Sequence, residues 1–329
     1  MAGFTTSSLS NYTVEDQGEL REKAIYGPVS MPLFTVVEGI KYSEKLPYFT
    51  TAPAMQADTT CASVNVSGDG GTFAQITLTV DGVKYEDGWC FKDLESKFTK
   101  KYLRKGAKLD EGSATELMNT LIGNYYGEIA KIHEYAIWQA SKTQNTFSTN
   151  LKQFNGFLQS LETAGGYVNQ QTVAGTSYTS ITVANVLTIF QNQWLATPAD
   201  IKRNDNLITV CGDDTFDKLV IALTNANLYH YNTNGSTPSR EMMLPGTNMK
   251  IKAVPGLNGD NNASLPAAFK NRIITFYKDQ AVVGTDMVSD MDSDMTWYEK
   301  KDDKFYLRSR YKLTTGWFFP SQVVSFATV

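Results

Sequence analysis

The stretch KFYLRSRYKLTTGWFFPSQVV, residues 304–324, alternates with a period of two close to the end of the chain. One side of its first half carries Lys304, Tyr306, Arg308, Arg310 and Lys312. The residues between these positions are mostly apolar. A period of two is typical of a strand that is buried on one face only. The stretch therefore predicts a long strand with one apolar face and one cationic face.

The clearest helix signal lies well upstream of this strand. Residues Ser113–Glu116 match a capping box directly before an apolar pattern. The pattern recurs at helical spacing through Leu117, Leu121, Tyr125, Ile129 and His133, and no proline interrupts it before Ser141. Such a helix would be about 40 Å long at 1.5 Å per residue, which suits a structural spine.

Two further segments lack the residues for a core of their own. Alternating runs at 59–67 and 72–80 flank the glycine-rich turn 68–71 and predict a β-hairpin, marginal in water without a partner surface. Residues 81–89 continue into a second turn, and 92–103 form a basic helix. Residues 1–48, interrupted by prolines, predict an extended arm. We expect arm and hairpin to become ordered only against another copy of the chain.

Residues between the spine helix and the final strand predict a compact mixed lobe. Helices are expected at 151–166, 181–196 and 213–228, and strands at 206–212 and 249–254. A further strand at 272–277 leads through an acidic stretch into the alternating strand. Helices and strands in this order indicate an α/β-like lobe.

The composition excludes several classes of protein. The chain has 329 residues with 42% hydrophobic and 19% charged residues, as in an ordered globular protein of two or three lobes. A formal net charge of -4 argues against a dedicated DNA-binding module. Three widely spaced cysteines indicate reduced thiols. The N-terminal residues do not resemble a signal peptide, and no apolar run reaches the length of a membrane helix. These features predict a cytoplasmic product with no membrane partner.

No catalytic, cofactor or metal site is predicted. The two histidines, His133 and His230, have no Cys, Asp or Glu at ligand spacing, and His133 is expected to pack in the core. The glycines at 68–71 precede a strand instead of a helix, so a hairpin turn is favoured over a phosphate loop. The stretch Asp290–Asp294 imitates the start of a calcium loop but lacks its glycine and closing glutamate. A solvated acidic loop is the interpretation, with a weak divalent-ion site as the alternative.

The order of these segments resembles the tailed-phage major capsid protein with the Hong Kong 97 fold, and local motifs support the resemblance. The spine ends in HEYAIWQASKTQNTF (133–147), similar to a Glu-x-x-Ile-Trp ending of some phage capsid subunits. NGFLQSLE (155–162) resembles the segment after the spine, and VCGDDTFDKLVIAL (210–223) resembles the strand–helix element of the central lobe. RSRYKLTTGWFFPSQVVSF (308–326) is similar to the family's ending, a basic strand followed by a glycine turn and P-x-x-V-V.

The resemblance implies an α+β fold with six parts. These are an N-terminal arm (1–48), an extended loop with a basic helix (49–107), a spine helix of the peripheral domain (108–149), an axial domain (150–265), returning strands of the peripheral domain (266–316) and a C-terminal return to the axial domain (317–329). The final strand would run beside the spine helix. Its cations Arg308, Arg310 and Lys312 would face a neighbouring subunit or the shell surface, and Lys84 is the loop lysine nearest to a crosslinking position.

The resemblance also implies a function without enzymatic activity. The chain would form the hexamers and pentamers of an icosahedral phage head around double-stranded DNA, which it would not bind sequence-specifically. Further partners would be portal and head-assembly proteins, and a separate scaffold or decoration protein. The product would assemble in the host cytoplasm and reside in the virion. Two alternatives stay open: an encapsulin-like nanocompartment shell, and a glycan-active enzyme or binding protein, suggested by the 12% aromatic residues.

Overall fold

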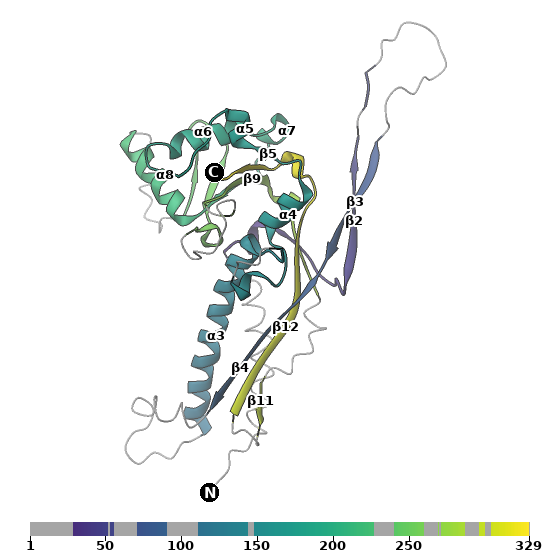
Figure 1. The fold of residues 1–329 in the computed structure, drawn as a ribbon, viewed down its shortest axis with the longest axis vertical. Coiled ribbons are helices and arrows are strands. Elements are labelled where there is room, and N and C mark those ends of the chain that lie inside the picture. The colour runs from purple at the N-terminus through teal and green to yellow at the C-terminus, as the bar shows by residue number, and fades with distance from the viewer. Residues whose placement is uncertain are drawn as a thin grey trace, which may run out of the picture.

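The computed structural model describes residues 29–51, 53–55, 71–90, 111–143, 148–226, 240–259, 269, 271–286, 296–299 and 304–328. Several predicted features lie outside these ranges: the strand at 59–67, the helix at 92–103, His230 and the acidic stretch Asp290–Asp294. The molecule is elongated, with a long helix and a long sheet side by side, a rounded lobe at one end and a projecting hairpin (Figure 1).

The long sheet is built around β12 (Lys304–Trp317), the strand predicted from the alternating stretch. It pairs antiparallel with β4 (Asp81–Cys90) over ten residues, from Lys304 opposite Cys90 to Leu313 opposite Asp81. Its other edge pairs with β11 (Thr296–Glu299) and β10 (Ala281–Thr285), and β10 pairs in parallel with β1 (Thr35–Val37).

The strand β4 corrects the expectation of a turn at 81–89. The segment contains two Asp-Gly pairs, at 81–82 and 87–88, and these indicated turns. Between them Val83 is buried and Tyr85 half-buried, whereas Lys84 is exposed. This alternation suffices to form a strand because the whole segment pairs with β12. Propensities of single residues carry no information about such a partner.

The spine helix α3 spans Glu111–Gln139 and is about 43 Å long at 1.5 Å per residue. It begins two residues before Ser113, so the predicted capping box lies inside the helix and does not start it. In its second half Tyr126, Ile129, His133, Ala136 and Ile137 are buried. These positions follow the predicted apolar stripe.

The lobe contains a six-stranded sheet in the order β5-β13-β9-β6-β8-β7. Its strands are β5 (Val168–Asn169), β6 (Leu207–Cys211), β7 (Glu241–Met243), β8 (Lys250–Ala253), β9 (Ile273–Tyr277) and β13 (Val324–Phe326). The helices are α4 (Phe157–Ala164), α5 (Gln170–Ala174), α6 (Val186–Ala196), α7 (Ala199–Lys202) and α8 (Asp213–Asn225). The predicted α/β lobe is therefore correct in kind, and the C-terminal strand β13 lies inside its sheet.

Helix α4 is shorter than the helix predicted at 151–166, because the chain first crosses the end of α3. A β-carbon at Gly156 would lie 2.6 Å from the Ala136 carbonyl oxygen, so the two backbones touch at this glycine. The helix begins only after this crossing and ends at Gly165 and Gly166, which both have positive φ.

The projecting hairpin is formed by β2 (Ser43–Thr50) and β3 (Thr72–Thr79), paired antiparallel from Ser43–Thr79 to Thr50–Thr72. The predicted partner of 72–80, the run at 59–67, lies outside the described residues, and the partner that the structure describes for β3 is β2. In this pairing Leu46 stands opposite Ile76, an apolar cross-strand pair. The expected boundary between arm and loop, after residue 48, falls inside β2.

Two large clusters of buried side chains hold the molecule together. One joins the end of α3 to α4, β10, β12 and the segment before β1, and the other fills the lobe around α6, α8 and β8. Met31, Leu33 and Phe34 belong to the first cluster, and the Phe34 ring lies 5.2 Å from that of Trp138. The expectation that residues 1–48 become ordered only against another copy is therefore wrong for 31–40, since these residues pack on their own chain.

Candidate assembly surfaces

The face of the long sheet that meets the spine helix forms a neutral, close-packed seam. The Tyr311 hydroxyl contacts Nε2 of His133, and their ring centroids lie 4.9 Å apart. The Tyr85 ring stacks nearby, 5.8 Å from His133. Complete burial lowers the pKa of His133 to about 4, so the imidazole is neutral at pH 7. The predicted role of His133 as a packed core histidine is thus supported by its surroundings.

The opposite face of the same sheet carries the predicted contact residues. Because alternate residues of a strand face opposite sides, the burial of Leu307, Ser309 and Tyr311 turns Arg308 and Arg310 away from α3. The register adds Lys84 directly opposite Arg310. The structure therefore brings Lys84, Arg308, Arg310 and Lys312 together on one surface, which we call the cationic face, together with Tyr306 and Glu86.

Most of these cations have contacts within their own chain. Glu86 accepts a hydrogen bond from the Lys84 ammonium at 2.6 Å and one from Nε of Arg308 at 2.5 Å. These bonds, that from Lys84 first, lower the pKa of the Glu86 carboxyl. The Lys312 ammonium donates to the Lys41 carbonyl at 2.5 Å. On this face of the β4–β12 ladder the four cations stand with one carboxylate, Glu86, and the carboxylate of Asp286 accepts from the Lys312 amide at 3.1 Å at its edge, so cations outnumber carboxylates there.

The hairpin leaves the body from the upper end of the same face. A β-carbon at Gly316 would lie 2.6 Å from Cδ2 of Leu78. The Leu78 side chain therefore packs directly on the backbone of β12 at this glycine. Leu78 and Ile40 are buried against Val282. The root of the hairpin is thus fixed by apolar packing on its own sheet.

Farther out, the hairpin exposes aromatic side chains. The rings of Phe49 and Phe73 pack on each other at 4.5 Å between centroids, yet Phe49 is 46% and Phe73 80% exposed. Met55, beyond them, is fully exposed. The outer part of the hairpin therefore presents apolar surface to solvent in the single chain.

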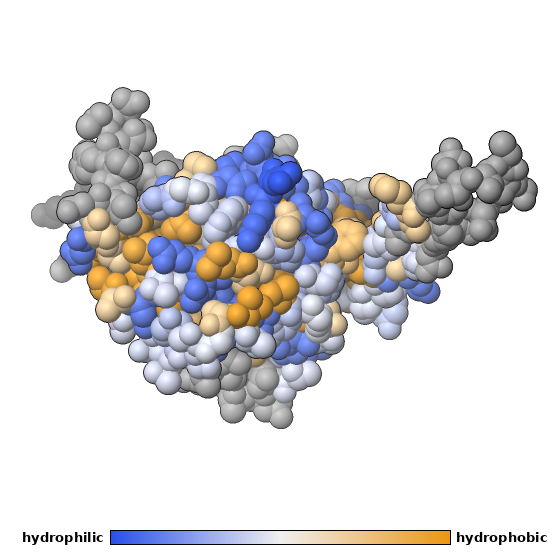
Figure 2. Space-filling view, turned by 90° about the horizontal axis from the view of Figure 1, so that it is seen from above, coloured by the Kyte–Doolittle hydropathy of each residue, from blue (hydrophilic) through white to orange (hydrophobic). Residues whose placement is uncertain are grey.

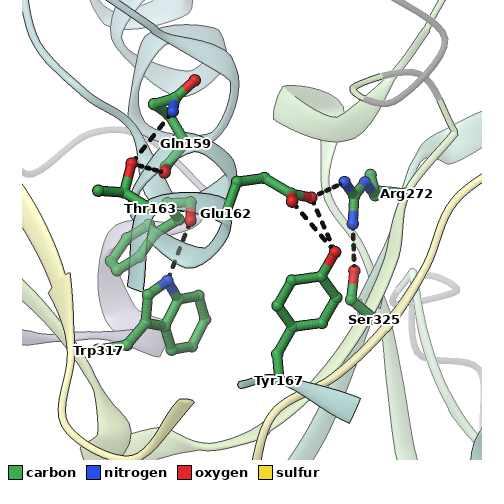
Figure 3. A network of polar contacts seen from close by, with 8 residues as sticks. Gln159, Glu162, Thr163, Tyr167, Arg272, Trp317 and Ser325 are labelled. Atoms are coloured by element: carbon green, nitrogen blue, oxygen red, sulfur yellow. Dashed lines mark hydrogen bonds and ion pairs between the residues drawn. The ribbon is translucent and has the colours of Figure 1, made fainter. Parts of the chain in front are cut away.

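A largely buried ion pair fixes helix α4 to the sheet of the lobe (Figure 3). The Arg272 guanidinium, almost fully buried before β9, pairs with Glu162 of α4 and donates to Oγ of Ser325 in β13 at 2.6 Å. The Tyr167 hydroxyl donates to the same carboxylate at 3.0 Å. Beside this network Nε1 of Trp317, at the end of β12, donates to the Phe157 carbonyl at 3.0 Å. Helix α4 is therefore bonded both to the lobe sheet and to the long sheet, and we call this the lobe joint.

A second buried carboxylate fixes the start of the described chain. Glu134 accepts hydrogen bonds from the Ser30 amide at 3.1 Å and the Ser30 hydroxyl at 2.5 Å. The indole of Trp138 donates to the same hydroxyl oxygen at 2.7 Å. Burial raises the pKa of the Glu134 carboxyl. The segment leading into β1 is thus attached to the spine helix at Ser30.

The described residues offer little for chemistry. They contain no group of three or more His, Cys, Asp or Glu side chains placed to hold a metal ion, and the acidic stretch Asp290–Asp294 lies outside them. Burial raises the pKa of the Cys211 thiol, which is therefore a protonated core residue. None of the helices in the described part of the chain is long and apolar enough to cross a membrane.

A shallow groove of about 280 Å³ opens on the lobe. It is lined by Leu187, Gln191, Trp194, Leu195, Leu223, Leu244, Pro245 and Thr247. These residues are apolar or neutral, so the groove has no acid, base or charged ligand group. Viewed from above, apolar side chains are scattered over this end of the lobe among polar ones, and the hairpin extends to one side (Figure 2).

The structure is similar to solved structures of known proteins, whereas comparisons of the sequence find no match. No protein-family model and no curated protein matches the sequence. The structure is similar to a chain of the capsid asymmetric unit of cyanophage A-1(L), with 11% identity, a TM-score of 0.57 and coverage of 90% of this chain and 91% of that one. It is also similar to a chain of the capsid of a native GTA particle, with 11% identity, a TM-score of 0.54 and coverage of 91% and 89%.

A third likeness extends over nearly all of both chains. A chain of the satellite phage P4 procapsid, which includes the size determination (Sid) protein, has 10% identity, a TM-score of 0.53 and coverage of 97% of this chain and 100% of that one. The chain therefore has the fold of phage capsid proteins, and the predicted α+β capsid fold is confirmed. At such low identity the likeness concerns the fold alone.

Proposed function

We propose that the chain is a major capsid protein that assembles into the hexamers and pentamers of an icosahedral phage head around double-stranded DNA. The observation that carries the proposal is the structural match to chains of phage and GTA capsids over about nine tenths of both chains. A match to the lobe alone would be compatible with many functions. The long spine helix and the projecting hairpin suit a subunit that contacts several neighbours in a shell.

The surfaces described above have roles in this proposal. With the boundary moved to the start of β2, residues 1–42 form the arm and 43–107 the extended loop, whose strand β4 joins the long sheet. Residues 108–149 and 266–316 form the peripheral domain, and 150–265 form the axial domain, to which 317–329 return. The loop lies over a neighbouring subunit, and Lys84, Arg308, Arg310 and Lys312 contact that neighbour. The exposed Phe49 and Phe73 are buried in the shell. Because each contact between subunits is weak, a wrongly placed subunit can dissociate and rebind during assembly. The closed shell is stable because many such contacts act together.

The role is structural and not enzymatic. Its partners are further copies of the chain, portal and head-assembly proteins, a scaffold or decoration protein, and packaged DNA contacted without sequence preference. The site of action is the virion.

Electron microscopy and sedimentation of the expressed full chain test the proposal. Capsomers or closed shells are expected, and in native particles the shell should enclose double-stranded DNA. A shell that encloses an enzyme would favour a nanocompartment instead. A chain that remains a compact monomer at high concentration would exclude both.

A further inference from the structure

Two buried glutamines of the lobe have polar atoms without a hydrogen-bond partner. Among the buried side-chain nitrogen and oxygen atoms of the described residues, three have none: Nε2 and Oε1 of Gln170, and Oε1 of Gln193. Both side chains are fully buried. An unpaired polar atom in the interior costs the free energy of its removal from water, and folded proteins pair almost all such atoms. These three atoms therefore call for a hydrogen-bonding group at this place in the lobe.

The two glutamines lie on helices that contact each other and the same strand. Gln170 is the first residue of α5, directly after β5, and Gln193 lies in the last turn of α6. Helices α5 and α6 lie next to each other in the lobe (Figure 1), and both contact β13. Val168, two residues before Gln170, pairs with Val324, whose carbonyl oxygen accepts a hydrogen bond from Nε2 of Gln193 at 3.0 Å. The unpaired atoms thus belong to side chains around the same segment of β13.

The orientation of the Gln193 amide is fixed by its other hydrogen bonds. Its Nε2 donates to the carbonyl oxygen of Val324 and to Oγ1 of Thr275, each at 3.0 Å. A carbonyl oxygen can only accept, so exchanging the amide nitrogen and oxygen would place two acceptors against each other. Oε1 of Gln193 therefore needs a donor from elsewhere. The Gln170 amide, with neither of its atoms paired, needs both a donor and an acceptor.

The surroundings favour a small neutral ligand. Along β13 the Ser325 hydroxyl accepts from the Arg272 guanidinium at 2.6 Å, so its neighbours Val324 and Phe326 face the other side of the sheet. The charged pair of Arg272 and Glu162 is therefore separated by the sheet from the apolar cluster that contains Phe326. Burying an ion among these apolar groups would be costly. Water is neutral and both donates and accepts, as the glutamine amides require.

We propose that the lobe binds ordered water between Gln170, Gln193 and β13, and that this water links α5 and α6 to the strand. Strand β13 pairs with β5 over two residues and with β9 over three, so its backbone ladder is short. Gln193 and the bound water extend the attachment of the strand to both helices. A buried water makes about three hydrogen bonds to protein groups, which matches the three unpaired atoms. The inference concerns the single chain and does not depend on the proposed assembly.

A density map of the full chain, at a resolution that shows ordered water, tests the site directly. Density for water is expected within about 2.7–3.2 Å of Oε1 of Gln193 and of the Gln170 amide. A map in which the two amides bond each other directly, or in which another side chain occupies the position, overturns the inference. A map with no density beside these atoms overturns it as well. This measurement uses the unchanged chain, so it does not require a variant that folds.

Replacing the Gln170 amide gives an independent measurement in solution. Gln170→Met keeps the length of the side chain but removes both polar atoms. If water bridges the amide, the variant breaks the bridge, and the melting temperature of the unassembled chain is expected to fall by about 2 °C or more. If the amide is unpaired, the variant removes a buried polar group without a partner, and the melting temperature rises instead. Gln191→Met, at an exposed position of α6, is the control and should leave the melting temperature unchanged. A rise in Gln170→Met, or a value equal to that of the control, contradicts the water bridge.

Discussion

Removal of the Glu162 carboxylate tests the lobe joint. Glu162→Ala takes the carboxylate partner away from the Arg272 guanidinium, which is 3% exposed, and leaves it beside the neutral hydroxyls of Ser325 and Tyr167. Breaking a buried ion pair from one side costs about 3–5 kcal/mol, because an uncompensated charge stays in the interior. The Glu162 side chain is one third exposed, so water screens part of this effect, and we expect a loss of about 2–3 kcal/mol.

Urea unfolding of the unassembled chain measures this loss. Glu128→Ala removes the carboxylate of an exposed pair, 3.8 Å from Lys131, and should cost at most about 0.5 kcal/mol. The double variant Glu162→Leu with Arg272→Met replaces both charges by apolar groups and should recover much of the lost stability. If Glu162→Ala proved as mild as Glu128→Ala, the joint would not be a stabilising contact and the reasoning would fail.

Three further outcomes are expected from the described contacts. Gly316→Val forces a side chain against Leu78, so the free energy of unfolding should fall by about 1–3 kcal/mol and proteolysis of the hairpin should become faster. Gly82→Val, which has open space around it, is the control and should change neither. Phe34→Ala should destabilise the unassembled chain by about 3–5 kcal/mol; an unchanged unfolding midpoint would mean that the segment before β1 is not part of its own core. The neutral His133 binds its proton in the unfolded chain below pH 6.5 but in the folded chain only below about pH 4, so stability should fall by up to about 3 kcal/mol across that window as pH drops. In His133→Gln this loss of stability between about pH 6.5 and pH 4 should disappear. Identical profiles of stability against pH for the variant and the unchanged chain would exclude His133 as the cause of the loss.

Elements with a regular local pattern could be predicted from the sequence. The alternation at 304–317 and the long apolar stripe of α3 each repeat over many residues, so the type of element was clear. Their mutual packing followed, because each has a single apolar face. The cationic face could also be predicted, since the residues between buried positions of one strand must point the other way.

Pairing between distant segments could not be read in this way. Strand β4 looked like turns, because its Asp-Gly pairs outweigh two inward side chains in a local reading. The pairing of β3 with β2 was also missed, because proximity in sequence favours a short hairpin with the next run along the chain, and β2 lies more than 20 residues before β3.

By itself the sequence determined the type of the regularly patterned segments, above all α3 and β12, and which face of each is apolar, because these depend on residue type and on spacing along one segment. Only the tertiary structure decided that Glu162 meets Arg272, 110 residues away, that Ser30 binds Glu134, and that Lys84 stands opposite Arg310. Such contacts join side chains whose local sequence carries no signal of the partner. They arise from the way backbones cross, at close approaches such as Gly156 against α3, and these crossings are properties of the packed chain.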